Sequence, residues 1–200
     1  MPPSLTNPAV DRLRHAWIFF RHWLKDPLTT ASVVPSGDDL ARAMADRLHD
    51  DDQCVVELGP GTGAITGRLI ERLGPEARFT AVELNERFAK TLSERYPAIE
   101  VLTGDARQLG ELLPEAFKPV DAVVSSLGFL AMPGSLCREI LEAVFLVMNP
   151  QGRIIQFSYT PRSPIPQRVL EGLGAECKRV STAWKNLPPA FVFEIRRKPR

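Results

Sequence analysis

The chain of 200 residues lacks the features that mark secreted, zinc-binding or membrane-spanning proteins. Its 3 cysteines are scattered and form no Cys-x-x-Cys spacing, so we expect neither a disulfide scaffold nor a metal site. No apolar run approaches the roughly 20 residues of a membrane-spanning helix, and no signal-peptide pattern is evident. A formal net charge of +1 provides no long-range field toward nucleic acid or an anionic membrane. We therefore expect a cytoplasmic protein whose attraction to such partners is confined to local patches.

One glycine-rich turn lies between a strand pattern and a helix pattern. Two β-branched residues and the acid Glu57 precede Gly59, Gly61 and Gly63, and residues 64–70 have the pattern of a helix. Glycine permits backbone conformations that are closed to other residues and lets a ligand approach the main chain. The spacing Gly-x-Gly-x-Gly differs from the Gly-x-Gly-x-x-Gly of dinucleotide-binding folds. It predicts a strand, a tight turn and a helix that together bind a ligand.

Polar residues close three further predicted strands. Residues 78–83 end in Glu83, residues 99–103 are followed by Asp105, and residues 121–127 end in small polar side chains. An acid at the end of the second strand is placed to accept hydrogen bonds from two ribose hydroxyls. Either acid could instead cap the following helix. The ordered series of polar strand ends favours one ligand site at the carboxyl ends of the strands.

The regular alternation of elements predicts an α/β fold with a doubly wound, mostly parallel sheet. We expect strands at 53–58, 78–83, 99–103, 121–127 and 152–159, with helices at 62–73, 86–95, 107–116, 135–147 and 165–173. Two strand-like runs at 176–183 and 190–196 follow.

Two elements precede the sheet. Residues 38–49 form an amphipathic pattern with Ser36 as the expected N-cap. Residues 11–25 mix aromatic and basic side chains, which is typical of a helix that lies in a membrane interface, or of one that packs its apolar stripe on the domain. We expect a boundary that separates an N-terminal helix and lid loop (1–37) from the main domain (38–200). The candidate membrane residues are Arg14, Trp17, Phe20, Trp23 and Lys25.

The run from Glu57 to Gly63 resembles motif I of the class I S-adenosylmethionine-dependent methyltransferases. The resemblance implies a Rossmann-like sheet of seven strands with an antiparallel final strand, S-adenosylmethionine as cofactor and S-adenosylhomocysteine as product. The implied cofactor-binding residues are Ser36, Glu57, Gly59, Gly61, Gly63, Glu83, Leu84, Asp105, Ala106 and Ser125.

Further segments resemble the bacterial phospholipid N-methyltransferases, which convert phosphatidylethanolamine stepwise to phosphatidylcholine. They are residues 19–37, Ser125-Ser126-Leu127-Gly128, 157–164 and Asn186-Leu187-Pro188-Pro189-Ala190. Gly128 stands where that family usually has proline. The resemblance implies an enzyme on the inner face of the cell membrane, with a phospholipid substrate and an anionic surface as partners and no obligate protein partner.

The acceptor site is expected after the fourth and fifth strands. Ser125, Ser126 and the carbonyl of Leu127 are the candidates for orienting the amine, and the ring of Tyr159 suits an ammonium that gains methyl groups. Tyr159 could instead pack on the helix at 165–173. Candidate ligands for a phosphodiester are Arg21, Arg162 and Lys185, since arginine and lysine bind phosphate; the alternative for each is a solvated surface charge.

Two other activities compete with this interpretation. The rRNA adenine N6-dimethyltransferases have a nearly identical motif I, but they need Asn-x-Pro followed by an aromatic residue after the fourth strand. Ser125-Ser126-Leu127-Gly128 provides neither the amide nor the aromatic ring, so a flipped base and a nucleic-acid partner are disfavoured. A small-amine methyltransferase that uses its N-terminal helix only as a lid remains open.

Overall fold

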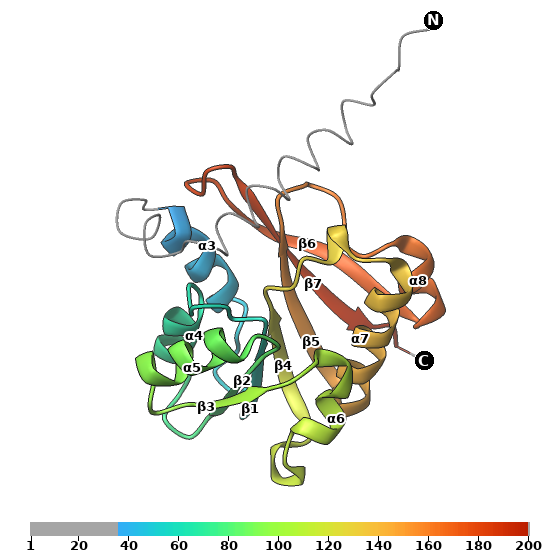
Figure 1. The fold of residues 1–200 in the computed structure, drawn as a ribbon. Coiled ribbons are helices and arrows are strands. Elements are labelled where there is room, and N and C mark those ends of the chain that lie inside the picture. The colour runs from blue at the N-terminus through green and yellow to red at the C-terminus, as the bar shows by residue number, and fades with distance from the viewer. Residues whose placement is uncertain (1–35, 200) are drawn as a thin grey trace, which may run out of the picture. The chain divides into compact units, whose positions relative to one another are not determined.

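A computed structural model of the chain describes residues 36–199 (Figure 1). The predicted helix at 11–25 lies outside the described residues. So do the candidates Arg14, Trp17, Phe20, Arg21, Trp23 and Lys25.

Seven strands form one mixed sheet in the order β3-β2-β1-β4-β5-β7-β6. They are β1 (Cys54–Leu58), β2 (Arg78–Glu83), β3 (Glu100–Thr103), β4 (Val120–Ser125), β5 (Met148–Ser158), β6 (Ala175–Ala183) and β7 (Ala190–Arg197). β1 to β5 pair in parallel, whereas β7 is antiparallel to both β5 and β6. The predicted doubly wound sheet with an antiparallel final strand is confirmed.

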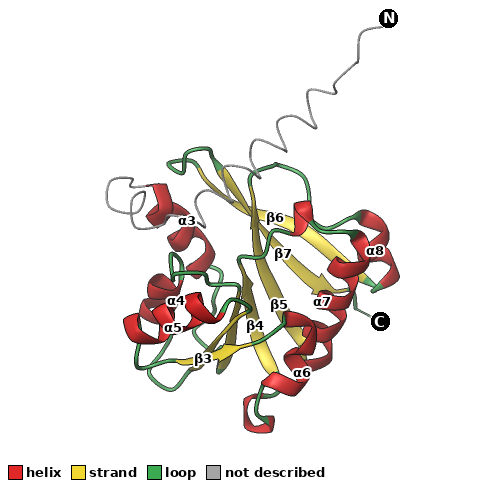
Figure 2. Cartoon of the chain, in the orientation of Figure 1, coloured by secondary structure: helices red, strands yellow, loops and turns green. Residues whose placement is uncertain are grey.

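Helices cover both faces of the sheet (Figure 2). One face carries α3 (Ser36–Ala45), α4 (Thr66–Arg72) and α5 (Glu86–Arg95), and the other carries α6 (Leu109–Leu112), α7 (Gly134–Val147) and α8 (Gln167–Gly172). Short 3-10 helices η1 (Ala106–Gln108), η2 (Glu115–Phe117) and η3 (Phe129–Ala131) lie in the connections. None of the helices among residues 36–199 has the length and apolar character needed to cross a bilayer.

Three predicted helices differ from the observed ones. The helix predicted at 62–73 begins only at Thr66, because the backbone at Gly63 is left-handed and cannot continue a helix. The helix predicted at 38–49 starts at Ser36 and ends at Ala45, after which three-residue turns follow. Ser36 therefore belongs to the helix that it was expected to cap. The helix predicted at 107–116 is divided into η1, α6 and η2, with Pro114 between the last two.

The largest hydrophobic core lies between α7 and the sheet. Along α7 the buried residues are Cys137, Ile140, Leu141, Val144 and Phe145. Their spacing of three and four residues places them on one helix face. They pack in one cluster with side chains of β1, β4 and β5. This packing holds the strand ends in place.

A buried ion pair joins the loop before β1 to β5. Arg153 donates to both carboxylate oxygens of Asp52, and one of these contacts, from Nη1 to Oδ1, measures 3.1 Å. Asp52 also accepts the backbone N–H of His49 at 2.8 Å, and Arg153 Nε donates to the carbonyl of Arg47 at 3.0 Å. Each guanidinium nitrogen of Arg153 and each carboxylate oxygen of Asp52 thus has a hydrogen-bond partner, which offsets the cost of burying the two charges.

We expect Asp52→Ala to lower the free energy of unfolding by about 3–5 kcal/mol, because it leaves the guanidinium of Arg153 buried without a counterion. Denaturant unfolding measures the effect. The matched control is Asp50→Ala, which removes an exposed ion pair with Arg72 and should cost less than about 1 kcal/mol. Equal effects of the two substitutions would contradict the assigned role of the buried pair.

Candidate active site

The carboxyl ends of the five parallel strands meet at one edge of the sheet. Backbone hydrogen bonds join neighbouring loops there: Gly59 N–H to Val82 O, Gly104 N–H to Glu83 O, and Ser126 N–H to Leu58 O, at 2.9–3.0 Å. The edge therefore brings together the predicted residues of each described strand end. These are Gly59, Gly61 and Gly63 after β1, Glu83 and Leu84 at β2, Asp105 and Ala106 after β3, Ser125 to Leu127 at β4, and Tyr159 after β5.

The glycine turn after β1 is left-handed at each of its three glycines, with φ of 65° at Gly59, 59° at Gly61 and 88° at Gly63. A Cβ atom on Gly59 would lie 2.7 Å from Cδ2 of Leu127. The turn therefore packs directly against the loop after β4. The left-handed backbone favours glycine at residue 59, and an added Cβ would also require the end of the Leu127 side chain to shift.

Glu83 fastens the glycine turn to the end of β2. Its Oε2 accepts the N–H of Gly61 at 3.0 Å, and its Oε1 accepts the N–H of Asn85 at 2.9 Å. A carboxylate has about four acceptor positions, so two remain. Glu83 is nearly buried, whereas the neighbouring Leu84 is exposed. Glu83 therefore offers hydrogen-bond acceptors for two hydroxyls, and Leu84 beside it offers an apolar surface for a flat ring.

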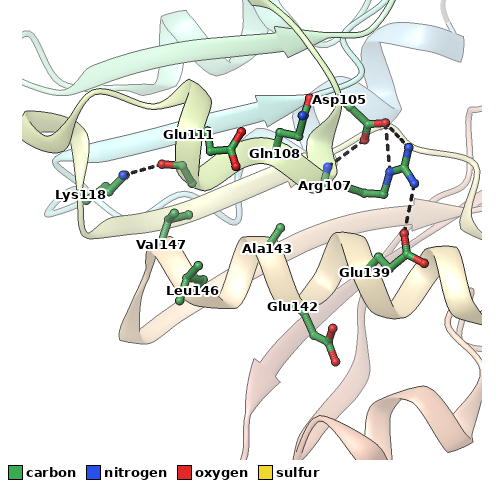
Figure 3. A pocket seen from close by; sticks show the side chains of 11 residues that line it. Asp105, Arg107, Gln108, Glu111, Lys118, Glu139, Glu142, Ala143, Leu146 and Val147 are labelled. Atoms are coloured by element: carbon green, nitrogen blue, oxygen red, sulfur yellow. Dashed lines mark hydrogen bonds and ion pairs between the residues drawn. The ribbon is translucent and has the colours of Figure 1, made fainter.

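Asp105 lies at the rim of a groove of about 960 Å³ between η1, α6 and α7 (Figure 3). Arg107 donates to Asp105 Oδ2 through Nε and Nη2 at 3.0 and 2.7 Å, and its backbone N–H donates to Oδ1 at 2.9 Å. Arg107 also pairs with Glu139 of α7. The hydrogen bonds from Arg107 lower the pKa of Asp105. The carboxylate is therefore ionised and held in one orientation.

Glu57 is fully buried beneath the glycine turn. Thr66 Oγ1 donates to its Oε2 at 2.7 Å, while its Oε1 has no partner among the described residues. Burial raises the pKa of Glu57 from 4.5 to about 8, and the nearby charge of Glu83 acts in the same direction. The two acids predicted for the cofactor site therefore differ: Glu83 is hydrogen-bonded at both oxygens, whereas Glu57 is fully buried and has a raised pKa.

The acceptor segment after β4 is held from several sides. The buried Ser125 accepts the N–H of Leu127 at 3.3 Å. The carbonyl of Leu127 accepts both the N–H of Phe129 and Nε2 of Gln156, each at 3.0 Å. Its two lone pairs are thus engaged, whereas the half-buried hydroxyl of Ser126 has no hydrogen bond to the described residues. Within residues 36–199, Ser126 is therefore the serine of the acceptor segment whose hydroxyl has no hydrogen bond.

Gln156 of β5 was missed by the sequence reasoning. Its Nε2 also donates to Phe157 O at 2.8 Å, and its Oε1 is buried with no partner among residues 36–199. The only signal in the sequence is an amide within the apolar run Ile154-Ile155-Gln156-Phe157. Because Gln156 donates a hydrogen bond to the carbonyl of Leu127, it connects the acceptor segment to β5.

Tyr159 packs edge-on against the ring of Phe157, with centroids 5.6 Å apart, and the side chain of Asn186 interacts with its hydroxyl. Burial raises the pKa of Tyr159, although the interaction with Asn186 acts to lower it, so the phenol stays protonated. Arg162, after β5, and Lys185, after β6, are exposed. Both therefore follow strands whose carboxyl ends lie at the candidate site.

Known proteins with this sequence pattern are methyltransferases. A methyltransferase-domain profile matches residues 55–152. An ornithine lipid N-methyltransferase of Singulisphaera acidiphila is 30% identical over 189 residues, which cover 92% of this chain and 97% of the relative. This chain belongs to the class I S-adenosylmethionine-dependent methyltransferases.

One further relative of this methyltransferase is named for ribosomal RNA, and solved structures share its fold. A ribosomal RNA small subunit methyltransferase A of a Synechococcus strain is 32% identical over 197 residues, covering 91% of this chain but 66% of the relative. A TehB-like methyltransferase of Corynebacterium glutamicum has a TM-score of 0.63 at 15% identity, with 96% of this chain and 100% of that one covered. TrmN of Thermus thermophilus has a TM-score of 0.61 at 22% identity, with 80% and 48% covered. The structural likenesses establish the fold.

The cofactor of this methyltransferase is S-adenosylmethionine, and the residues at the edge suit it. Gly59 leaves room for close approach to the main chain, and Glu83 keeps free acceptor positions for hydroxyls. The unpaired Oε1 of Glu57 is a buried polar atom beneath the turn. On this fit, the glycine turn would hold the methionine part, Glu83 would hold the ribose, and the surface formed by Leu84, Asp105 and Ala106 would hold the adenine.

We expect Gly59→Ala to weaken binding of S-adenosylhomocysteine about tenfold or more, equivalent to about 1.4 kcal/mol, because the methyl group would displace Leu127 and strain the turn. Isothermal titration calorimetry measures the affinity. Gly74→Ala is the matched control, since nothing lies within 4 Å of the added Cβ and its backbone is not left-handed. Unchanged affinity in Gly59→Ala would contradict the assigned turn.

We expect the protein to lose stability as the pH rises from 4.5 toward 8, because the unfolded chain ionises Glu57 at a lower pH than the folded protein does. The slope from this group is at most about 1.4 kcal/mol per pH unit. Glu57→Gln keeps an acceptor for Thr66 and removes the titration, so its stability relative to the native protein should increase from pH 5 to pH 8. If the free energies of unfolding of Glu57→Gln and the native protein change in parallel with pH, the raised pKa of Glu57 is refuted.

Proposed function

We propose that this methyltransferase transfers methyl groups to the amine of phosphatidylethanolamine, stepwise toward phosphatidylcholine, at a membrane surface. The observation that carries the proposal is the acceptor segment Ser125-Ser126-Leu127, which resembles that of phospholipid N-methyltransferases. The similarity to a lipid N-methyltransferase along 92% of the chain supports it. A lipid amine is thus the acceptor class that best suits this edge of the sheet.

The chemistry requires alignment rather than strong acid or base catalysis. The cofactor supplies an activated methyl group on a sulfonium. The amine nitrogen must lose its proton, after which its lone pair forms the new N–C bond while the C–S bond breaks, with the electrons going to sulfur. Reacting atoms need to lie about 3–3.5 Å apart. Ser126 has the free hydroxyl to orient the amine, and water at the open edge takes the proton.

Tyr159 and the exposed cations complete the proposed head-group site. An aromatic ring attracts an ammonium that has lost its hydrogen-bond donors, so Tyr159 suits the more methylated acceptors. Burial raises the pKa of its phenol, which favours a binding role over proton transfer. Arg162 and Lys185 offer positive charge for the phosphodiester.

A second candidate is an amine on an ornithine-containing lipid. The Singulisphaera acidiphila relative, of which this chain covers 97%, carries that activity in its name. Methylation of an rRNA adenine has less support, because the Asn-x-Pro-aromatic segment is replaced by Ser125-Ser126-Leu127-Gly128.

The deciding experiment incubates the purified protein and labelled S-adenosylmethionine with three acceptors. These are phosphatidylethanolamine/phosphatidylglycerol vesicles, ornithine lipid/phosphatidylglycerol vesicles, and ribosomal RNA. Label in mono-, di- or trimethylated phosphatidylethanolamine is expected. Label only in ornithine lipid would select the second candidate. Label in RNA alone, or in none of the three from a protein that binds S-adenosylhomocysteine, would overturn the lipid assignment.

We expect Ser126→Ala to lower kcat on phosphatidylethanolamine vesicles about three- to tenfold, the rate equivalent of one hydrogen bond of about 0.5–1.5 kcal/mol. Affinity for S-adenosylhomocysteine should stay the same. Ser93→Ala is the matched control, because Ser93 is exposed on α5 and bonds only to the carbonyl of Lys90. A full rate in Ser126→Ala would remove this serine from the acceptor site.

A further inference from the structure

The turn between β6 and β7 presents two large apolar side chains to solvent. Trp184 is 74% exposed and Leu187 is 76% exposed. We call residues 184–187 the hairpin turn; it connects the orange and red strands of Figure 1. Leaving a tryptophan and a leucine this exposed, three residues apart, is unfavourable in water unless a partner covers them.

The hairpin turn lies on the same side of the sheet as the candidate active site. β7 is antiparallel to both β5 and β6, so β6 runs parallel to β5 and ends at the same edge. Two other exposed leucines, Leu84 and Leu130, follow β2 and β4 at this edge. Leu146, the remaining large exposed apolar side chain among the described residues, is near the end of α7 and thus toward the opposite edge. Four of the five large exposed apolar side chains among the described residues therefore lie toward the carboxyl ends of the parallel strands, where the acceptor would enter.

The backbone of the hairpin turn is held firmly while its apolar side chains project. Asn186, between the two, is buried and donates from Nδ2 to Pro188 O at 2.7 Å. Its side chain also interacts with the hydroxyl of Tyr159. The N–H of Lys185 donates to Asp39 of α3 at 3.0 Å. A turn anchored in this way keeps its apolar pair exposed at little further entropic cost on docking.

We propose that the hairpin turn enters the interfacial layer of a lipid bilayer and so directs the acceptor edge toward the membrane. A tryptophan beside a leucine and the exposed cation Lys185 is the combination that favours the boundary between head groups and acyl chains. A second cation, Arg162, follows the neighbouring β5. The inference rests on the proposed function for its choice of partner, since a lipid acceptor must reach Ser126 and Tyr159 from a bilayer surface.

Tryptophan fluorescence tests the insertion directly. The full chain has 3 tryptophans, and Trp17→Phe/Trp23→Phe leaves Trp184 as the reporter. With phosphatidylethanolamine/phosphatidylglycerol vesicles we expect a blue shift of its emission and quenching by lipids brominated along the acyl chain. Unshifted and unquenched emission from protein that floats with the vesicles would overturn the inference.

Vesicle flotation in the native tryptophan background gives an independent decision. We expect Trp184→Ser/Leu187→Ser to reduce the bound fraction about tenfold, with unchanged affinity for S-adenosylhomocysteine as the check on folding. Leu146→Ser is the matched control, because Leu146 is 79% exposed but lies away from the acceptor edge. Equal binding of the two variants, or no binding by the native protein, would overturn the inference.

Failure of insertion and failure of the proposed activity can be told apart. Methylation of phosphatidylethanolamine in detergent micelles, where no bilayer is present, tests the activity alone. Methylated lipid together with an unquenched Trp184 would contradict insertion of the hairpin turn but support the proposed enzyme activity. A quenched Trp184 with no methylated lipid would keep the turn as a membrane contact and remove the assignment.

Discussion

The hydrogen bond from the Gly61 N–H to the carboxylate of Glu83 is the contact on which the candidate site depends. It joins the turn after β1 to the end of β2 and orients the acid whose remaining lone pairs face the cofactor site. The turn is left-handed at all three glycines, and its own backbone contributes a hydrogen bond from the Gly63 N–H to Pro60 O at 3.0 Å. Contacts with Glu83 and Leu127 add to this bond and help to define the shape of the turn.

Much of this arrangement follows from the sequence because parallel strands bring their carboxyl ends together. Glu83 and Asp105 could be assigned to one edge from the strand pattern alone, and Gly59 from its place before a helix. The start of α4 could not, because a helix pattern in the side chains does not reveal that the backbone at Gly63 is left-handed. The 3-10 turns after Ala45 were not predicted for a similar reason, because the apolar spacing of a helix continues across them.

Contacts between segments that are distant in the chain could not be predicted from the sequence. Gln156 looks like an isolated amide in a buried strand, and only the fold shows that it holds the carbonyl of Leu127. The interaction between Asn186 and Tyr159 likewise depends on β7 lying between β5 and β6, which strand patterns do not specify. The state of Glu57 depends on how completely the fold removes it from water. All three depend on tertiary packing, so local sequence patterns do not predict them.

The Asn186 side chain connects two parts of the molecule. Tyr159 directly follows β5, the strand whose Gln156 holds the acceptor segment, whereas Asn186 belongs to a hairpin that also contacts α3 through the N–H of Lys185. A ligand that docks on the hairpin would therefore lie one side chain away from the aromatic ring proposed to meet the acceptor.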